Sequence, residues 1–157
     1  VMMSDANAMS TRSFTNPPSI MTSTNKPEWR RMQQPAANGH GNARSLAGLY
    51  TGLLQGRLLD EAVLREMTHE HSAGEDRTLL ASTRFGLGCW LDQPDVANAT
   101  FAMGPRAFGH PGAGGCIGFA DPERELGFGF VTNTLGPYVL MDPRAQSLAR
   151  CVAACLH

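Results

Sequence analysis

Phe108-Gly-His-Pro-Gly-Ala-Gly-Gly-Cys-Ile-Gly-Phe119 is the stretch of this 157-residue chain that decides the fold. It holds five glycines and a single histidine, His110. Glycine in a strand costs stability, because it has the largest backbone entropy and no side chain to pack. Glycines at this density indicate that another backbone, or a ligand, comes close to the strand.

The residues that follow predict a β-hairpin. Leu126-Gly-Phe-Gly-Phe-Val131 alternates phenylalanine with glycine at the period of a strand, and Asp121-Pro122 between the two runs is typical of a turn. We expect strands near residues 84–91, 100–104, 108–120 and 126–133.

Three helices are predicted from apolar spacing and capping residues. Asn42 precedes a helix over residues 43–55, and Asp60 precedes one that continues through Thr68. Asp142-Pro143 begins the last helix, with proline at the first helical position. The apolar stripe of this helix, expected to pack across the sheet, consists of Leu148, Cys151, Val152, Cys155 and Leu156.

Three segments together resemble the serine β-lactamase-like hydrolases, the esterases related to class C β-lactamases and D-alanyl-D-alanine carboxypeptidases. His110-Pro-Gly112 looks like the third motif of that family, a Lys-Thr-Gly or His-x-Gly triplet on an edge strand of the catalytic cleft. Two more segments stand in the family's order: Pro35 to Tyr50, which contains Asn38-Gly-His-Gly41, and Arg84-Phe-Gly-Leu-Gly-Cys-Trp90.

The resemblance covers about residues 27–156 and implies an α/β fold of the α+β type. We expect an antiparallel sheet flanked by helices, the C-terminal part of a β-lactamase/transpeptidase-like domain. Residues 35–157 would form this part. Residues 1–34, rich in Ser, Thr, Asn, Pro and Met, would be an irregular remnant of a missing upstream region.

In the resembled family, a helical Ser-x-x-Lys nucleophile segment and a Tyr-x-Asn or Tyr-x-Ser motif lie upstream of Asn-Gly-His-Gly. Only 37 residues precede Asn38 here, so we expect the chain to be the C-terminal portion of a larger hydrolase. Ser23-Thr-Asn-Lys26 has the Ser-x-x-Lys spelling, but the spacing is useful only on a helix. Pro27 pushes Lys26 away from helical backbone angles, so we interpret Ser23 as part of an exposed loop and expect no nucleophile in this chain.

The resemblance places His110 in the proton network around the nucleophile, where an imidazole can donate or accept near neutral pH. Ala113, which follows the triplet glycine, would give its backbone N–H to the oxyanion hole. Gly112 and Gly114 would contact the substrate beside it. The alternative is a packed glycine-rich strand with a structural histidine.

The remaining histidines and the cysteines favour structural roles. His40 is expected to fix a turn, and His69 and His71 to lie in a solvated loop without a third metal ligand. The cysteines lack Cys-x-x-Cys spacing, and we interpret them as small buried residues rather than metal ligands or a disulfide. They are Cys89, Cys116, Cys151 and Cys155. We therefore expect neither a metal nor a cofactor.

The amino-acid composition excludes several classes of protein. A hydrophobic content of 42% with 17% charged residues indicates a globular chain. The net charge of −1 gives no electrostatic basis for binding nucleic acid or an anionic membrane, and no apolar run is long enough for a transmembrane helix. The N-terminus lacks the features of a signal peptide. The compartment is not revealed by the sequence, although an esterase-type parent favours the cytoplasm.

The activity implied for the parent is hydrolysis of small carboxylic esters through an acyl-serine intermediate, with β-lactams or D-amino-acid peptides as alternative substrates. A second hypothesis is non-enzymatic: the chain is an inactive fragment, or an interaction module that completes a partner carrying the nucleophile. In either case the expected partners are a small-molecule ester in the intact parent, the missing N-terminal part, or a second copy of the chain.

Overall fold

The computed structural model describes residues 5–16, 18 and 23–156, and the chain divides into two compact units. One unit contains the residues up to Gly41 together with Glu75–Ala81, and the other contains Asn42–Gly74 and the residues from Ser82 onward. The division follows Gly41, and within the first unit the side-chain amide of Asn38 donates to the backbone carbonyls of Trp29 and Met32.

The first unit contains two short helices, α1 (Met9–Phe14) and α3 (Pro27–Arg31), in the stretch predicted to be irregular. The start of α3 has a local cause that the prediction overlooked. Proline stands at the first helical position and Glu28 in the first turn, and both favour a helix N-terminus. Thus Pro27, which keeps Lys26 extended, also begins the next helix.

The second unit is organised around a sheet with the strand order β1-β2-β3-β4-β5-β6. The strands from β2 to β6 pair antiparallel, each with its neighbour in sequence. Their bounds are β1 Ser72–Asp76, β2 Ala81–Phe85, β3 Trp90–Leu91, β4 Phe108–Pro111, β5 Ile117–Asp121 and β6 Leu126–Phe130. The predicted hairpin is β5–β6, in which Phe119 pairs with Phe128.

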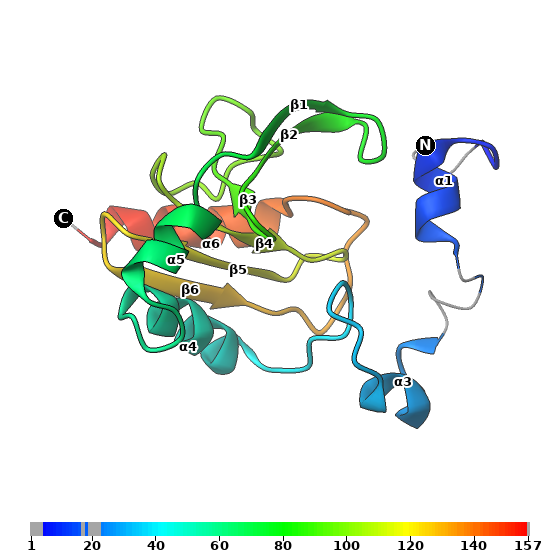
Figure 1. Ribbon diagram of the computed structural model, residues 1–157, viewed down its shortest axis with the longest axis horizontal. Coiled ribbons are helices and arrows are strands. Elements are labelled where there is room, and N and C mark those ends of the chain that lie inside the picture. Colours follow the sequence, from blue (N-terminus) through cyan, green and yellow to red (C-terminus); the bar gives the residue numbers. More distant parts are fainter. Residues whose placement is uncertain (1–4, 17, 19–22, 157) are drawn as a thin grey trace. The chain divides into compact units, whose positions relative to one another are not determined.

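Helix α4 (Ala43–Leu54) lies directly on β5 and β6, as Figure 1 shows. Asn42 caps it through a reciprocal pair of hydrogen bonds with Ser45, as predicted. Gly127 and Gly129 allow this close approach, because a Cβ at Gly127 would stand 2.6 Å from the carbonyl oxygen of Ala47. The glycines of this hairpin therefore make room for a helix backbone.

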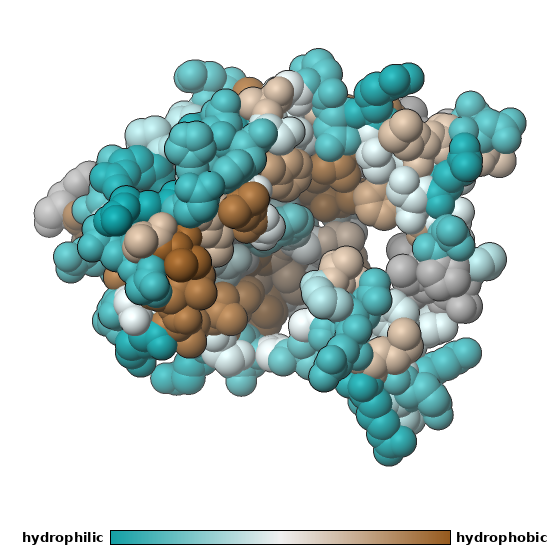
Figure 2. All heavy atoms as spheres, in the orientation of Figure 1, coloured by the Kyte–Doolittle hydropathy of each residue, from teal (hydrophilic) through white to brown (hydrophobic). Residues whose placement is uncertain are grey.

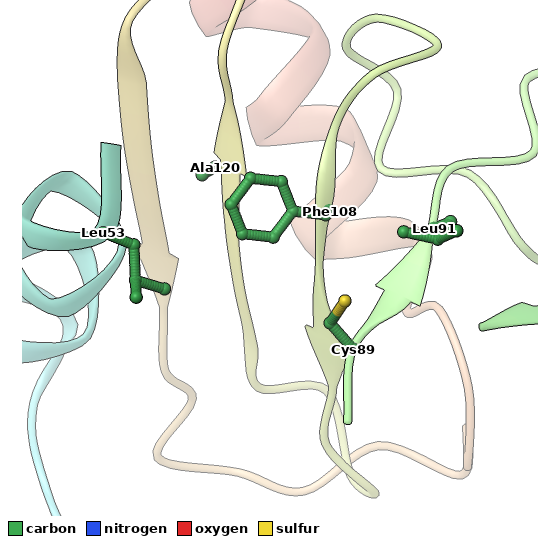
Figure 3. Packing of buried hydrophobic residues seen from close by; sticks show 5 residues of the cluster. All are labelled: Leu53, Cys89, Leu91, Phe108 and Ala120. Carbon is green, nitrogen blue, oxygen red and sulfur yellow. The ribbon is translucent and has the colours of Figure 1, made fainter. Parts of the chain in front are cut away.

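The core beside α4 is built from α4, β3, β4 and β5, and Figure 3 shows the ring of Phe108 at its centre. Its buried members are Leu53, Cys89, Leu91, Phe108 and Ala120. Leu59 and Leu64 flank this cluster from either side of the N-cap of α5 (Glu61–Met67), whose capping residue Asp60 was predicted.

The last helix, α6 (Pro143–Ala154), lies behind the sheet in Figure 1 and begins at Asp142 as predicted. The predicted apolar stripe is wrong: Leu148 and Leu156 are 44% and 45% exposed, and Cys151 and Cys155 are also exposed. The helix buries Ala145, Gln146 and Ala149 instead. Two alanines let the helix backbone come close to its neighbours, and the Gln146 amide donates to the carbonyls of Ala97 and Thr100.

Three of the predicted strands differ from the structure. The strand expected over residues 108–120 divides into β4 and β5 at the turn between Pro111 and Ile117. Residues 100–104 form a loop, because the buried Asp92 carboxylate accepts hydrogen bonds from the Phe101 N–H and the Thr100 hydroxyl. Burial raises the pKa of Asp92, and these hydrogen bonds oppose the rise. Residues 84–91 divide between β2 and β3 at a turn in which Gly86 lies against the carbonyl of Met67.

Within the described ranges, no helix combines the length and the apolar character needed to span a membrane.

Candidate active site

Strand β4 carries the His-Pro-Gly triplet, and it lies between β3 and β5 rather than at the sheet edge that the resemblance implies. On one side, all four residues of β4 pair with β5, including His110 with Gly118. On the other side, β3 has only two residues, which pair with Phe108 and Gly109. The strand is thus paired on both sides where it begins and only with β5 at His110 and Pro111.

The ring of His110 is exposed, and its hydrogen bond defines its tautomer. Nδ1 lies 2.7 Å from the carbonyl oxygen of Pro111. A carbonyl oxygen can only accept, so Nδ1 carries the proton, and in the neutral ring Nε2 is the acceptor. His110 therefore presents a basic nitrogen that can take a proton.

Two aromatic residues hold the strand at His110. The ring of Phe85 stacks against the imidazole with 6.3 Å between centroids. Tyr50, from α4, packs on Gly118, the partner of His110 in β5. Burial raises the pKa of Tyr50 to about 12, Cys89 adds to the rise, and the backbone of His110 opposes it. Neither residue is predicted from the sequence to lie at the site, since only the fold brings them to β4.

The turn after the triplet uses most of its backbone groups internally. The N–H of Gly112 donates to the carbonyl of Cys116, and the N–H of Gly114 donates to the carbonyl of Tyr138. Gly114 and Gly115 have φ values of 92° and 116°, which glycine adopts readily. The N–H groups of Gly112 and Gly114 are therefore engaged within the protein.

Ala113 differs from the glycines on either side of it. Among residues 5–16, 18 and 23–156, no group accepts a hydrogen bond from its N–H. This donor lies three residues after His110, in a turn whose neighbouring peptides are fixed. Such an N–H is the kind of group that stabilises a developing oxyanion.

An ion pair between a buried carboxylate and an exposed guanidinium supports this turn from the start of α6. The guanidinium of Arg144 lies 2.7 Å from the carboxylate of Asp142 and also donates to the carbonyl of Gly114. Hydrogen bonding and charge from Arg144 hold the pKa of Asp142 below its usual range. The sequence predicts Asp142 only as a helix cap, because its contact with the turn depends on tertiary structure.

The other candidate residues are described within their own segments. Lys26 is the N-cap of α3 in extended backbone (ψ 141°), so Ser23 and Lys26 do not share a helix. The Nε2 of His40 lies 2.6 Å from the side-chain oxygen of Asn38. The rings of His69 and His71 meet edge to face, and His71 pairs with Glu66 at 3.3 Å.

No group of three His, Cys, Asp or Glu side chains that could hold a metal ion occurs in the described part of the chain. Cys89 is buried, Cys116 is partly buried, and the two cysteines of α6 are exposed, so burial holds for Cys89 alone. An open pocket in the first unit, which contains none of the predicted site residues, is lined by Asn7, Met9, Arg12, Ser13, Asn16 and Arg77.

The antiparallel sheet with helices on both faces has the fold of a β-lactamase/transpeptidase-like domain. The family model described as Beta-lactamase matches residues 4–150. The chain belongs to this family of serine hydrolases. The match begins well before residue 27, where the resemblance seen in the sequence begins.

Three proteins to which the chain is similar agree with this assignment. The chain is 35% identical over 116 residues to the esterase/beta-lactamase LipL of Mycobacterium tuberculosis, a match that covers 69% of this chain and 25% of that protein. A family VIII carboxylesterase structure is 30% identical with a TM-score of 0.72, covering 85% of this chain and 36% of the other. A penicillin-binding protein homolog from Caulobacter crescentus is 32% identical with a TM-score of 0.73, covering 87% and 40%. The chain thus spans well under half the length of these relatives.

Proposed function

We propose that this chain supplies one wall of an acyl-serine hydrolase site that acts on small carboxylic esters. In this proposal a serine from outside the 157 residues attacks the ester carbonyl, and the oxygen of the tetrahedral intermediate accepts a hydrogen bond from the Ala113 N–H. Nε2 of His110 takes part in the proton transfers around the serine. The observation that carries the proposal is the uncommitted N–H of Ala113 in a turn whose adjacent N–H groups are engaged.

The state of His110 fits this role. A general base must be able to accept a proton, and the Nδ1–H bond to Pro111 leaves Nε2 as the acceptor. The same bond would stabilise the imidazolium formed once Nε2 is protonated. We place the substrate beside His110, where β4 has no paired residue in β3.

The test uses the intact polypeptide that carries these residues, with p-nitrophenyl butyrate as substrate. Ala113→Pro removes the N–H, and we expect kcat to fall about 10²–10³-fold, the usual cost of losing one oxyanion donor. Ala113→Gly keeps the N–H and is the matched control, with kcat close to that of the wild type. Equal losses in both variants would show that the turn, and not its donor, matters.

Ester hydrolysis is the preferred activity because the carboxylesterase is among the structural relatives, whereas LipL carries both activities in its name. Comparing kcat/KM for p-nitrophenyl butyrate, nitrocefin and a D-alanyl-D-alanine peptide on the same polypeptide decides among the substrates. A higher kcat/KM for nitrocefin or the peptide than for the ester would replace the ester proposal.

A second candidate function is that of a module without chemistry of its own. The extended backbone at Lys26, which separates it from any helix with Ser23, favours this role for the isolated chain. We expect the 157-residue chain alone to hydrolyse p-nitrophenyl esters no faster than buffer. Hydrolysis that disappears in Ser23→Ala would instead identify Ser23 as the nucleophile.

A further inference from the structure

The most highly connected polar group near the candidate site is the ion pair of Asp142 and Arg144. The Asp142 side chain is 1% exposed, and its carboxylate accepts from the backbone N–H, Nε and Nη2 of Arg144 at 2.9, 3.0 and 2.7 Å. Both carboxylate oxygens are thus used, and the guanidinium is held in one orientation by a fork of two side-chain hydrogen bonds.

The outer donors of this guanidinium reach two other segments. Nη2 donates to the carbonyl of Gly114 at 3.1 Å, and Nη1 donates to the carbonyl of Thr134 at 3.0 Å. The same two segments also bond each other, since the Gly136 N–H donates to the Gly114 carbonyl at 2.7 Å. Arg144 therefore joins the start of α6, the 112–116 turn and the loop after β6.

Two glycines clear the space that this arrangement needs. A Cβ at Gly115 would stand 2.5 Å from Oδ2 of Asp142, and a Cβ at Gly136 would stand 2.6 Å from Nη2 of Arg144. The ion pair therefore lies in direct contact with the backbone of both segments. Any side chain at either position would force the guanidinium away from the Gly114 carbonyl.

We infer that Arg144, oriented by Asp142, is a positioning residue that helps to fix the direction of the Ala113 N–H by holding the carbonyl of the next residue, Gly114, in the same turn. This inference rests on the proposed function of Ala113. The Gly112 N–H bond to Cys116 secures the turn on one side of Ala113, and the Arg144 and Tyr138 bonds to Gly114 secure it on the other. A donor fixed before reaction needs no reorganisation as charge develops.

The kinetic test compares Arg144→Gln with the wild type in the intact polypeptide, with p-nitrophenyl butyrate as substrate. We expect kcat to fall about 10–100-fold, the order that a small misplacement of a catalytic group costs, with KM changed less than about twofold. Arg144→Lys keeps the charge but not the fork, so its kcat should lie in between. Arg150→Gln, an exposed arginine on the same helix, should leave both constants unchanged.

Loss of Arg144 also leaves a buried carboxylate unpaired, so a purely structural role must be distinguished. The double variant Asp142→Asn with Arg144→Gln retains a capping side chain and removes the unpaired charge. We expect its melting temperature to recover toward that of the wild type while kcat stays low. Recovery of kcat together with the melting temperature, or a wild-type kcat in Arg144→Gln, would overturn the inference.

Backbone hydrogen exchange tests the positioning role of Arg144 independently of the proposed function of Ala113. Arg144→Gln should speed exchange of the backbone N–H groups of Gly114 and Gly136, whether or not the protein hydrolyses esters. Unchanged exchange would overturn the positioning network itself. A second outcome is faster exchange in Arg144→Gln together with a wild-type kcat in Ala113→Pro. The hydrogen-bond network of Arg144 would then be real, but the proposed role of Ala113 would be wrong, and with it the catalytic part of the inference.

Discussion

At the scale of single residues, His110 is defined by its contacts on three sides. Its ring bonds the carbonyl of Pro111, Phe85 stacks on the ring, and Tyr50 from α4 packs on Gly118, the partner of His110 in β5. None of these contacts uses Nε2. The residue thus combines a fixed ring position with one accepting nitrogen, which is what a general base requires.

Tyr50 provides a test of this environment through its pKa. Burial raises the pKa of the Tyr50 phenol in the folded protein to about 12, from an ordinary value of 10.0. The folded protein therefore keeps the phenol proton between these two pH values. The sign follows from linkage: the contribution of Tyr50 to stability is fully present below about pH 10 and is lost as pH rises toward 12.

We therefore expect the difference in tyrosinate absorbance between wild type and Tyr50→Phe to develop only well above pH 10. The wild type should also lose stability relative to Tyr50→Phe over the same range. A difference titration with its midpoint at pH 10 would mean that the phenol is solvated and does not pack on Gly118.

At the scale of elements, the contact between α4 and β6 sets the position of the site. Gly127 and Gly129 bring the helix backbone onto the strand, and this brings Tyr50 over Gly118 and toward His110. The distance between α4 and β6 therefore affects the site through the Tyr50 side chain alone.

A substitution in this interface and one on the exposed side of α4 should have opposite effects. Gly127→Ala places a Cβ 2.5 Å from the N of Thr51, so we expect a loss of about 1–3 kcal/mol in the free energy of unfolding. Gly48→Ala, in the exposed middle of α4 with no atom within 4 Å of its Cβ, should gain about 0.5–1 kcal/mol. Denaturant unfolding measures both. Equal effects of either sign would show that helix and strand do not meet as closely as described.

The helix starts at Asn42, Asp60 and Asp142 were predictable, because capping depends on residues within one turn. The buried face of α6 was not, because neighbouring loops select its alanines over the larger apolar residues. The loop at Phe101 escaped prediction for the same reason, since Asp92, nine residues away, satisfies its backbone.

In the candidate site, the triplet and Ala113 were predictable from local sequence, and the supporting residues were not. Asp142 and Arg144 lie about thirty residues from the turn that they hold. No local pattern distinguishes an arginine that bonds a distant carbonyl from one that is solvated. The unpaired side of β4 at His110 and Pro111 also depended on the length of β3, which the sequence did not indicate.

At the scale of the molecule, α4 and α5 leave apolar side chains uncovered, and Figure 2 shows a brown patch over this region. Leu49, Leu58 and Val63 are 49%, 55% and 47% exposed. In the described sheet, β6 is an end strand with one unpaired edge. Uncovered apolar surface and open edges both favour association with other chains.

We expect the isolated chain to self-associate at micromolar concentration, as measured by sedimentation velocity. Leu49→Glu with Val63→Lys should reduce association by adding charges to the patch. Leu148→Lys, at an equally exposed leucine on α6, is the matched control and should leave association unchanged. A monodisperse wild-type monomer with one sharp melting transition would contradict the account of this surface.

The central claim is that His110 acts in the chemistry of an acyl-serine site. The most direct measurement is the rate of the initial p-nitrophenol burst in the intact polypeptide, compared between the wild type and His110→Ala. We predict a rate about 10²–10⁴-fold lower with little change in melting temperature, because the ring is exposed. His40→Ala, which removes a hydrogen bond to Asn38, should lose some stability with a modest kinetic change. An unchanged burst rate in His110→Ala, together with a much lower melting temperature, would show that the histidine is structural and contradict the claim.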